Sequence, residues 1–238
     1  MSQFAGIPAD AVAFYAELEA NTTREWFAAH KDRYERSVRE PILALTEALE
    51  AEFGPARLFR PYVDVRFRTD KTPVKTEQAA VVEGGHGSGG SGGTGGTGGT
   101  EGTGYYLQVS ADGLVTGGGA MHHASDQIAR LRAAVDDERS GAELAEVVKT
   151  LRRRFEIGGE TLKRAPRGVD PDHPRIELMR HKSIIAWRRH GTPAWLSTGS
   201  VVRHVRDDWR AIRPLADWFA EHVGPTTSPV DERRPGGR

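Results

Sequence analysis

The chain has 238 residues, with 33 basic and 33 acidic side chains and no cysteine. A formal net charge of zero excludes a protein that is basic over its whole surface, as many nucleic-acid binders are, although a local basic patch remains open. Without cysteine the chain can form no disulfide, thiolate nucleophile or zinc–cysteine site. Its 37% hydrophobic and 28% charged residues are typical of a globular protein.

The N-terminus resembles neither a membrane anchor nor a leader. No run approaches the roughly 18 apolar residues of a membrane span. The first residues, MSQFAGIPADAVAFYAELEA, carry acids within their apolar stretch and have no basic start, unlike a secretory signal peptide. We therefore expect a cytoplasmic protein with no membrane partner.

The first fifty residues predict a helical block. An apolar stripe at helical spacing runs through residues 8–19. Thr22 and Glu25 form a capping box that predicts the start of a second helix, which Pro41 should break or restart. A third helix is predicted from its apolar side chains at Ile42, Leu45, Leu49 and Phe53.

The pattern then changes to short strands. Residues 58–67 alternate between polar and apolar side chains, as in a strand with one apolar face. Residues 78–83, 105–110 and 114–119 also predict strands, with a turn at 111–113, and 183–190 is either a strand or a helix end. Consecutive short strands joined by turns favour an antiparallel meander.

Helices resume after Ser125 and Asp126, a plausible N-cap pair. Apolar stripes predict helices through 128–135, 144–155 and 200–223, where Pro214 should kink or divide the last helix. The sequence thus predicts an α+β fold with one domain over residues 1–223, a sheet flanked by N- and C-terminal helices, and a disordered tail over 224–238.

Residues 84–104 form a glycine tract with Gly-Gly-Thr repeats. The tract has no apolar side chain that could enter a core, and its composition is that of a flexible linker. It lacks the GxxxxGK[ST] pattern of a phosphate-binding loop. We expect a disordered loop inserted between two strands, which costs little because loop-closure entropy grows slowly with length.

The densest chemistry lies in the stretch RPYVDVRFRTDKTPVK, residues 60–75. Its cations could converge on an anion while its carboxylates orient the guanidinium groups. The alternative is a solvated strand face held together by ion pairs. The candidate ligand-binding residues here are Arg60, Asp64, Arg66, Asp70, Lys71 and Lys75.

This stretch resembles the signature R-x-x-R-D-x-R-F-x-x-[DN]-K-x-P-Y-K of the family called domain of unknown function 2461. Other stretches are similar as well, among them NTTREWFAAHKDRYE (21–35), YYLQVS, TGGGAM, LKRAPRG and DPDHP. The chain departs from the signature at Val63, where the family usually has Arg, and at Val74, where it usually has Tyr. The resemblance covers residues 4–222 and implies a bacterial or fungal protein of the α+β type, but no reaction.

A second candidate is the run Gly117, Gly118 and Gly119, which ends a strand before a helix. Free N–H groups at such a junction can bind an anion, but Asp126 already offers a negative charge to that helix start. The alternative is that the glycines allow another backbone to approach the strand closely.

Further cations lie later in the chain. Lys163, Arg164 and Arg167 lie in a predicted loop and could complete an anion pocket, whereas the run 152–154 suits a helix C-terminus. A metal site of His122, Asp172 and His173 is conceivable, but DPDHP is also an ordinary proline-bounded turn, and the sequence has no strong metal-spacing motif. We therefore predict no metal and name no cofactor.

The leading functional hypothesis is a pocket for a small anionic ligand, with phosphate as one option, lined by the charged stretch 60–75. Whether the protein is an enzyme stays open, although a carboxylate there could act as a general base. The alternative is a binding or scaffold protein in which the charged stretch is a structural ion-pair network. Nucleic-acid binding would need a continuous basic stripe across residues 60–75 and 152–167 and is the less favoured class.

Overall fold

The computed structural model describes residues 4–63, 73–83, 103–121 and 123–227. Within these ranges six strands form one antiparallel sheet. Their spatial order is β1 (Ala56–Leu58), β2 (Glu77–Glu83), β3 (Thr103–Ser110), β4 (Gly113–Ala120), β6 (Ile184–Gly191) and β5 (Glu156–Gly158). The predicted α+β class and antiparallel sheet are confirmed, and the first four strands follow one another as a meander.

The N-terminal block consists of α1 (Ala9–Ala20), α2 (Arg24–Ala29), α3 (Lys31–Tyr34), the π-helical η1 (Glu35–Arg39) and α4 (Glu40–Phe53). The cap of α2 is Thr23 and not Thr22: the Thr23 hydroxyl accepts a hydrogen bond from the Trp26 N–H at 3.1 Å. Pro41 does not interrupt the path, because the backbone stays helical from α3 through η1 into α4.

The later helices are α5 (Ser125–Asp136), α6 (Glu138–Leu151), α7 (Ile176–Arg180), the short 3-10 helix η2 (Ala194–Ser197) and α8 (Val201–His222). Pro214 does not divide α8. It lies on the exposed side of the helix, where water can bond to the carbonyl oxygen that proline leaves unpaired. None of the described helices is both long and apolar enough to cross a bilayer.

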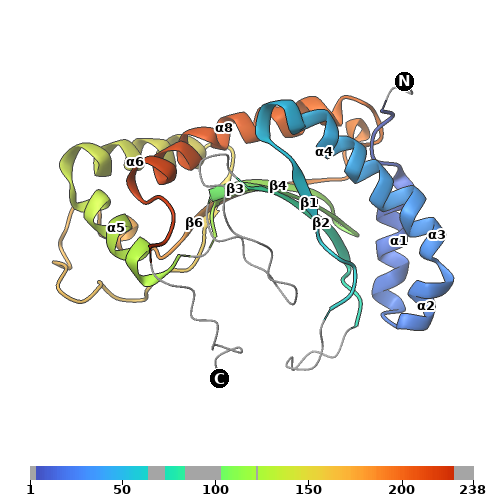
Figure 1. Cartoon of the computed structure of the whole chain (residues 1–238), viewed down its shortest axis with the longest axis horizontal. Helices are drawn as coiled ribbons and strands as arrows, with labels where there is room; N and C mark the ends of the chain where they lie inside the picture. The colour runs from blue at the N-terminus through green and yellow to red at the C-terminus, as the bar shows by residue number, and fades with distance from the viewer. Residues whose placement is uncertain (1–3, 64–72, 84–102, 122, 228–238) are drawn as a thin grey trace.

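The sheet arches, and α4 and α8 lie across its convex side (Figure 1). Helices α1, α2 and α3 stand at one end of this arch, and α5 and α6 pack at the other. Helices α1 to α3 lie beside the sheet edge formed by β1 and β2. The two edges of the sheet therefore lie near different helices.

The strands predicted at 78–83, 105–110 and 114–119 fall within β2, β3 and β4, and 183–190 proves to be strand β6. The strand predicted over 58–67 differs in its described part. Strand β1 ends at Leu58, the chain bends at Pro61, and only Tyr62 forms an isolated bridge, to Val74. Proline has no N–H to give to a ladder, which accounts for the interruption. Residues 64–67 lie outside the described ranges.

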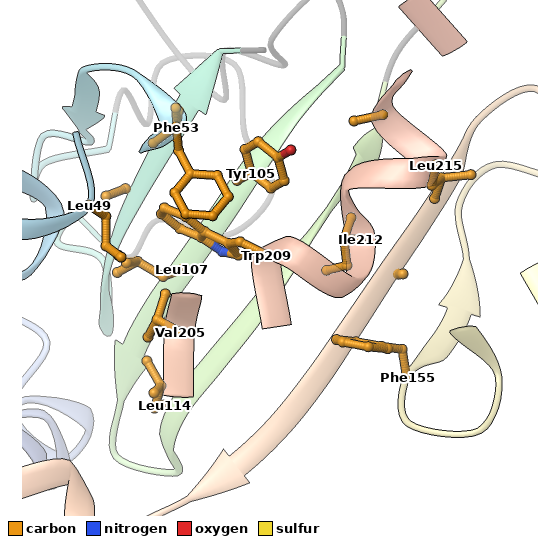
Figure 2. Close-up of a cluster of buried hydrophobic side chains, with 14 of the residues drawn as sticks. Leu49, Phe53, Tyr105, Leu107, Leu114, Phe155, Val205, Trp209, Ile212 and Leu215 are labelled. Carbon is orange, nitrogen blue, oxygen red and sulfur yellow. The ribbon is translucent and has the colours of Figure 1, made fainter. Parts of the chain in front are cut away.

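The core lies between α8, α4 and the convex side of the sheet, and Trp209 of α8 is at its centre with no exposed surface. Its ring stacks on Tyr105 with centroids 5.4 Å apart and meets Phe53 edge-on at 5.2 Å. The indole N–H donates to the Tyr106 carbonyl oxygen at 3.2 Å. Figure 2 shows these rings together with the aliphatic side chains of α8 and the strands.

The glycine tract and the tail are only partly described. Thr103 and Gly104, the last residues of the tract, belong to strand β3, and residues 84–102 lie outside the described ranges. Residues 224–227 of the expected tail contact α5: Asp126 accepts hydrogen bonds from Thr226 and Thr227, and Arg130 donates to the Pro225 carbonyl oxygen at 2.7 Å. The Asp126 carboxylate at the start of α5 is therefore already hydrogen-bonded within the protein.

Candidate functional site

The charged stretch begins beside the N-terminal helices. Its first residues pair with the segment before β2: the Val63 N–H donates to the Pro73 carbonyl oxygen at 3.0 Å, and the Lys75 N–H donates to the Pro61 carbonyl oxygen at 2.7 Å. Arg60 and Lys75 are therefore placed on neighbouring segments. The other candidates of this stretch lie outside the described residues, namely Asp64, Arg66, Asp70 and Lys71.

A pocket of about 180 Å³ opens between this stretch and the helical block. One wall comes from α2, α3 and η1, and the other from the end of β1 and the residues that follow it. Residues from two of the stretches that resemble the family, 21–35 and the described start of 60–75, thus face one another across the pocket. It is lined by Phe27, Lys31, Tyr34, Glu35, Arg39, Leu58, Phe59, Arg60, Pro61 and Tyr62.

The π-helix η1 shapes the helical wall. Pro41, just beyond it, has no N–H, and in a regular α-helix its ring would clash with the Ser37 carbonyl oxygen. The wider turn over residues 35–39 accommodates that missing bond. Glu35 begins this turn and Arg39 ends it, and both line the pocket.

A buried hydrogen-bond chain holds the floor of the pocket to the sheet. The Tyr34 hydroxyl donates to Oε1 of Gln78 at 2.5 Å. Nε2 of Gln78 donates to the carbonyl oxygens of Phe59 and Ala79, each at 2.9 Å. Burial raises the pKa of the Tyr34 phenol well above its ordinary value, with the Glu35 charge adding to the effect. Tyr34 therefore stays a neutral donor, and it links α3 to β2 and to the pocket wall.

The pocket is rich in positive charge. Lys31, Arg39 and Arg60 line it against one carboxylate, Glu35. Arg39 and Glu35 form an exposed ion pair at 3.5 Å, which such exposure makes weak. Among the described residues, neither Lys31 nor Arg60 forms an ion pair with a carboxylate. Two positive charges at this site are therefore not neutralised by a described acidic partner.

Aromatic rings complete the wall. Phe59 is flanked by two cations, the Lys75 ammonium at 4.9 Å and the Arg57 guanidinium at 5.0 Å from its ring centroid. Tyr62 is 48% exposed and meets Phe27 edge-on at 5.4 Å. An exposed aromatic side chain beside cations can contact the apolar part of a ligand whose charged part meets the cations.

The three candidate glycines lie elsewhere, inside β4, where β3 and β6 pair with them on both sides. A Cβ at Gly117 would lie 2.9 Å from the Ala186 carbonyl oxygen, and one at Gly119 would lie 2.4 Å from that of Ile184. Gly119 also has a φ of +121°, which favours glycine. These positions serve close approach of neighbouring strands, and β2 and β3 separate them from the pocket.

Lys163 and Arg164 are exposed in the loop after β5, at the sheet edge opposite β1. Arg180 donates to the Lys163 carbonyl oxygen at 3.3 Å, which ties this loop to α7. The structure therefore brings Arg60 and Lys75 close to one another but does not bring Lys163 or Arg164 to them.

The described residues weighed as metal ligands already have partners within the protein, and Nε2 of His173 lies 3.2 Å from Oδ1 of Asp136 in α5. Oδ1 of Asp170 accepts from the Asp172 N–H at 2.9 Å, and Nδ1 of His173 accepts from the Arg175 N–H at 3.0 Å. His122 lies outside the described residues. In the part of the chain that the structure describes, no group of three or more His, Cys, Asp or Glu is suited to a metal ion.

Lys31, Glu35 and Arg39 were not among the candidates predicted from the sequence, although they are three of the four charged residues in the described lining of the pocket. A signal was available, because Lys31 and Glu35 lie within one of the stretches that resemble the family, the residues 21–35. Periodicity alone could not select them, because exposed charges on a helix ordinarily face solvent.

No curated protein matches this chain. The family model described as a conserved hypothetical protein, DUF2461, matches residues 10–218, which is most of the chain and includes both walls of the pocket. On this match, the chain belongs to the DUF2461 family.

Proposed function

We propose that the protein binds a small anionic ligand in the pocket between α3, η1 and the charged stretch. Lys31, Arg39 and Arg60 would bind the anionic group, and Tyr62 would pack against its apolar part. The observation that carries the proposal is that the described lining places three cations against one carboxylate around a cavity of about 180 Å³.

Size and rigidity support a small ligand. Pockets for drug-sized molecules usually measure about 300–1,000 Å³, so this cavity suits a compact group such as a phosphate or a carboxylate with a short apolar part. The Tyr34–Gln78 bond fixes the floor before any ligand arrives, and a preformed site loses less entropy on binding. Arginine side chains also bind carboxylate and phosphate through paired N–H groups.

The rest of the charged stretch is included in the proposal on sequence grounds. Residues 64–72, which the structure does not describe, connect Val63 to Pro73. The Val63 N–H donates a hydrogen bond to the Pro73 carbonyl oxygen, so the two ends of this segment lie together next to Tyr62 of the pocket wall. We propose that Arg66 and Lys71 add positive charge to the ligand site and that Asp64 and Asp70 orient the cations. Lys75, over the Phe59 ring, would contribute to the same field.

The test is thermal unfolding of the full chain against a panel of inorganic phosphate, nucleotides and small carboxylates. A bound ligand at one hundred times its dissociation constant stabilises the folded state by about 2.7 kcal/mol. We expect at least one anion to raise the unfolding temperature, and Arg60→Gln and Lys31→Gln to reduce that shift. Arg36→Gln is the matched control, because Arg36 is exposed on η1 and does not line the pocket.

The competing hypothesis, a charged stretch with only a structural role, predicts a different result. The Arg60 and Lys31 variants would then unfold at lower temperature than the wild type, and no anion would shift any of the proteins. A steep fall of oligonucleotide affinity with salt would favour nucleic-acid binding instead.

A further inference from the structure

Helix α8 carries a carboxylate within its buried stripe. Asp208 has a side chain only 1% exposed, although its neighbours on that face of the helix are Val205, Trp209 and Ile212. A buried carboxylate without partners would be strongly destabilising. The groups that surround Asp208 must therefore compensate for the burial of its charge.

Four donors from three other parts of the chain meet the two oxygens of Asp208. On Oδ2, the Thr116 hydroxyl of β4 donates at 2.7 Å, and Nε2 of His190 in β6 lies at 2.7 Å. On Oδ1, Arg154 donates at 3.1 Å and Arg188 at 3.2 Å. Arg154 follows the end of α6 and Arg188 lies in β6, so the carboxylate joins elements far apart in sequence.

The cluster has more positive than negative charge. Two guanidinium groups share one carboxylate oxygen, so the group has a surplus of one positive charge even with a neutral imidazole. Each guanidinium has five N–H donors, and Asp208 takes one from each in the described structure. The side chains of Arg154 and Arg188 are 48% and 40% exposed, so their remaining N–H groups can reach a ligand from solvent.

His190 supplies a positioned imidazole beside these two arginines. Its side chain is 6% exposed, and Nε2 also lies 3.1 Å from the Thr116 hydroxyl. An Nε2–H bonded to the carboxylate would leave Nδ1 as the ring atom for a ligand. Trp195 meets the imidazole edge-on at 5.2 Å and stacks on His204 at 4.0 Å, which forms an aromatic wall on that side.

Strand β5 does not reach the part of β6 that carries Arg188 and His190. Strand β5 pairs with β6 only from Ile185 to Trp187. Beyond that, from Arg188 to His190, no described strand covers the outer edge of β6. This part of β6 lies near the sheet edge opposite β1, with β2, β3 and β4 between it and the pocket of Arg60.

We propose that Arg154 and Arg188, held together by the buried Asp208, form a second site for a doubly charged tetrahedral oxyanion of the phosphate type, with His190 as its neighbouring hydrogen-bond partner. Asp208 acts as a positioning residue: it aligns both guanidinium groups and the imidazole and does not itself touch the ligand. The surplus charge and the N–H groups that Asp208 does not engage provide the affinity, and the shared carboxylate provides the geometry. This site is independent of the proposed function of the other pocket.

The experiment uses inorganic phosphate as the probe and follows the imidazole nitrogen signals of His190 by NMR, assigned with a His190→Gln variant. The wild type should show a saturable shift of these signals. Arg154→Gln and Arg188→Gln should each weaken phosphate binding by about tenfold, the loss expected for one charge-assisted hydrogen bond. Acetate at equal concentration should bind more weakly, because it carries one charge.

The controls separate this site from general screening and from the other pocket. Arg153→Gln removes an exposed neighbouring charge, and Arg60→Gln removes a cation of the first pocket. In both variants, phosphate should shift the His190 signals as it does in the wild type. Thermal unfolding of every variant checks that it is folded. The proposal is overturned if phosphate produces no saturable shift, if acetate binds equally well, if Arg153→Gln weakens binding as much, or if the Arg154 and Arg188 variants lose stability without any change in binding.

Discussion

Gly118 of β4 lies directly beneath Ile212 of α8, and a Cβ added to the glycine would be 3.0 Å from Cγ2 of the isoleucine. The added Cβ would also be 2.8 Å from the Gly104 carbonyl oxygen. The glycine thus allows the helix to approach the sheet closely. The run 117–119 is explained by packing against neighbouring strands and this helix.

Gly118→Ala should therefore destabilise the fold. Overpacking of this kind costs about 1–3 kcal/mol, measurable by urea denaturation. A double-mutant cycle with Ile212→Ala should recover part of the loss, because removal of the isoleucine branch makes room for the new methyl group. An unfolding free energy equal to that of the wild type would contradict the close packing of α8 on β4.

Glu52 of α4 is surrounded by three arginines of α8. Arg210 donates to both of its oxygens at 2.7 and 2.9 Å, Arg213 donates at 2.9 Å, and Arg206 lies at 3.5 Å. The hydrogen bond from Arg210 is the main reason that the pKa of Glu52 is held below its ordinary value. A network of this type contributes more than an isolated surface pair.

Glu52→Gln should lower the free energy of unfolding by about 1 kcal/mol at low salt, and by less at high salt because ions screen exposed charges. Glu50→Gln is the control, since Glu50 is exposed on the same helix and forms no described ion pair. Chemical denaturation at two salt concentrations provides the measurement. Equal losses in both variants would show that the arginines contribute nothing specific.

Asp208 predicts acid sensitivity. Burial alone would raise the pKa of this carboxyl, but hydrogen bonds from His190 and Thr116 and the neighbouring positive charges outweigh burial and hold the pKa below its ordinary value. A group with a depressed folded pKa stabilises the fold above its unfolded pKa, and that contribution is lost as the pH falls through the folded pKa.

The wild type should therefore lose stability as the pH falls below about 4, the ordinary range of an aspartate. Asp208→Asn should be less stable near neutral pH by about 1–3 kcal/mol, because the amide keeps only one acceptor oxygen and turns an NH2 group toward donors that the carboxylate now accepts from. Its stability should also depend less on pH in the acidic range. Urea denaturation at pH 6 and pH 3 tests both points, and parallel pH profiles for the two proteins would refute the explanation.

Tyr34 and Tyr106 offer a matched pair. Each hydroxyl donates to a glutamine Oε1 at 2.5 Å, but the Tyr34–Gln78 bond is buried and the Tyr106–Gln108 bond is only partly buried. Tyr34→Phe leaves a buried acceptor unpaired and should cost about 1–3 kcal/mol. Tyr106→Phe should cost less, because water can reach Gln108. Thermal unfolding of both variants is the measurement, and a reversed order would contradict the locked pocket floor.

Local features of the chain were readable without coordinates. The strands at 78–83 and 105–110 follow from alternation and β-branched or aromatic side chains, and α8 follows from its apolar spacing. Errors arose where two local signals competed. Thr22 and Thr23 are both plausible caps, and Pro41 is compatible with either a break or the widened turn that it actually follows.

The candidate sites were predictable only in part. Arg60 and Lys75 were selected as a charged stretch, but the opposing wall of Lys31 and Arg39 was not. Asp208 was missed altogether, although its place in the apolar stripe of α8, three residues after Val205, was a visible irregularity. Its meaning depended on Thr116, which is 92 residues away in sequence.

The amino-acid sequence by itself determined the α+β class, the antiparallel sheet, and the helices and strands with one buried face. These properties depend on the spacing of apolar residues and on backbone preferences over a few neighbours, which are local. Only the tertiary structure decided that Lys31 faces Arg60 and that Asp208 meets His190. These contacts depend on the order of strands in the sheet and on where α3 and α8 pack. Neither can be predicted from the spacing of side chains along the chain.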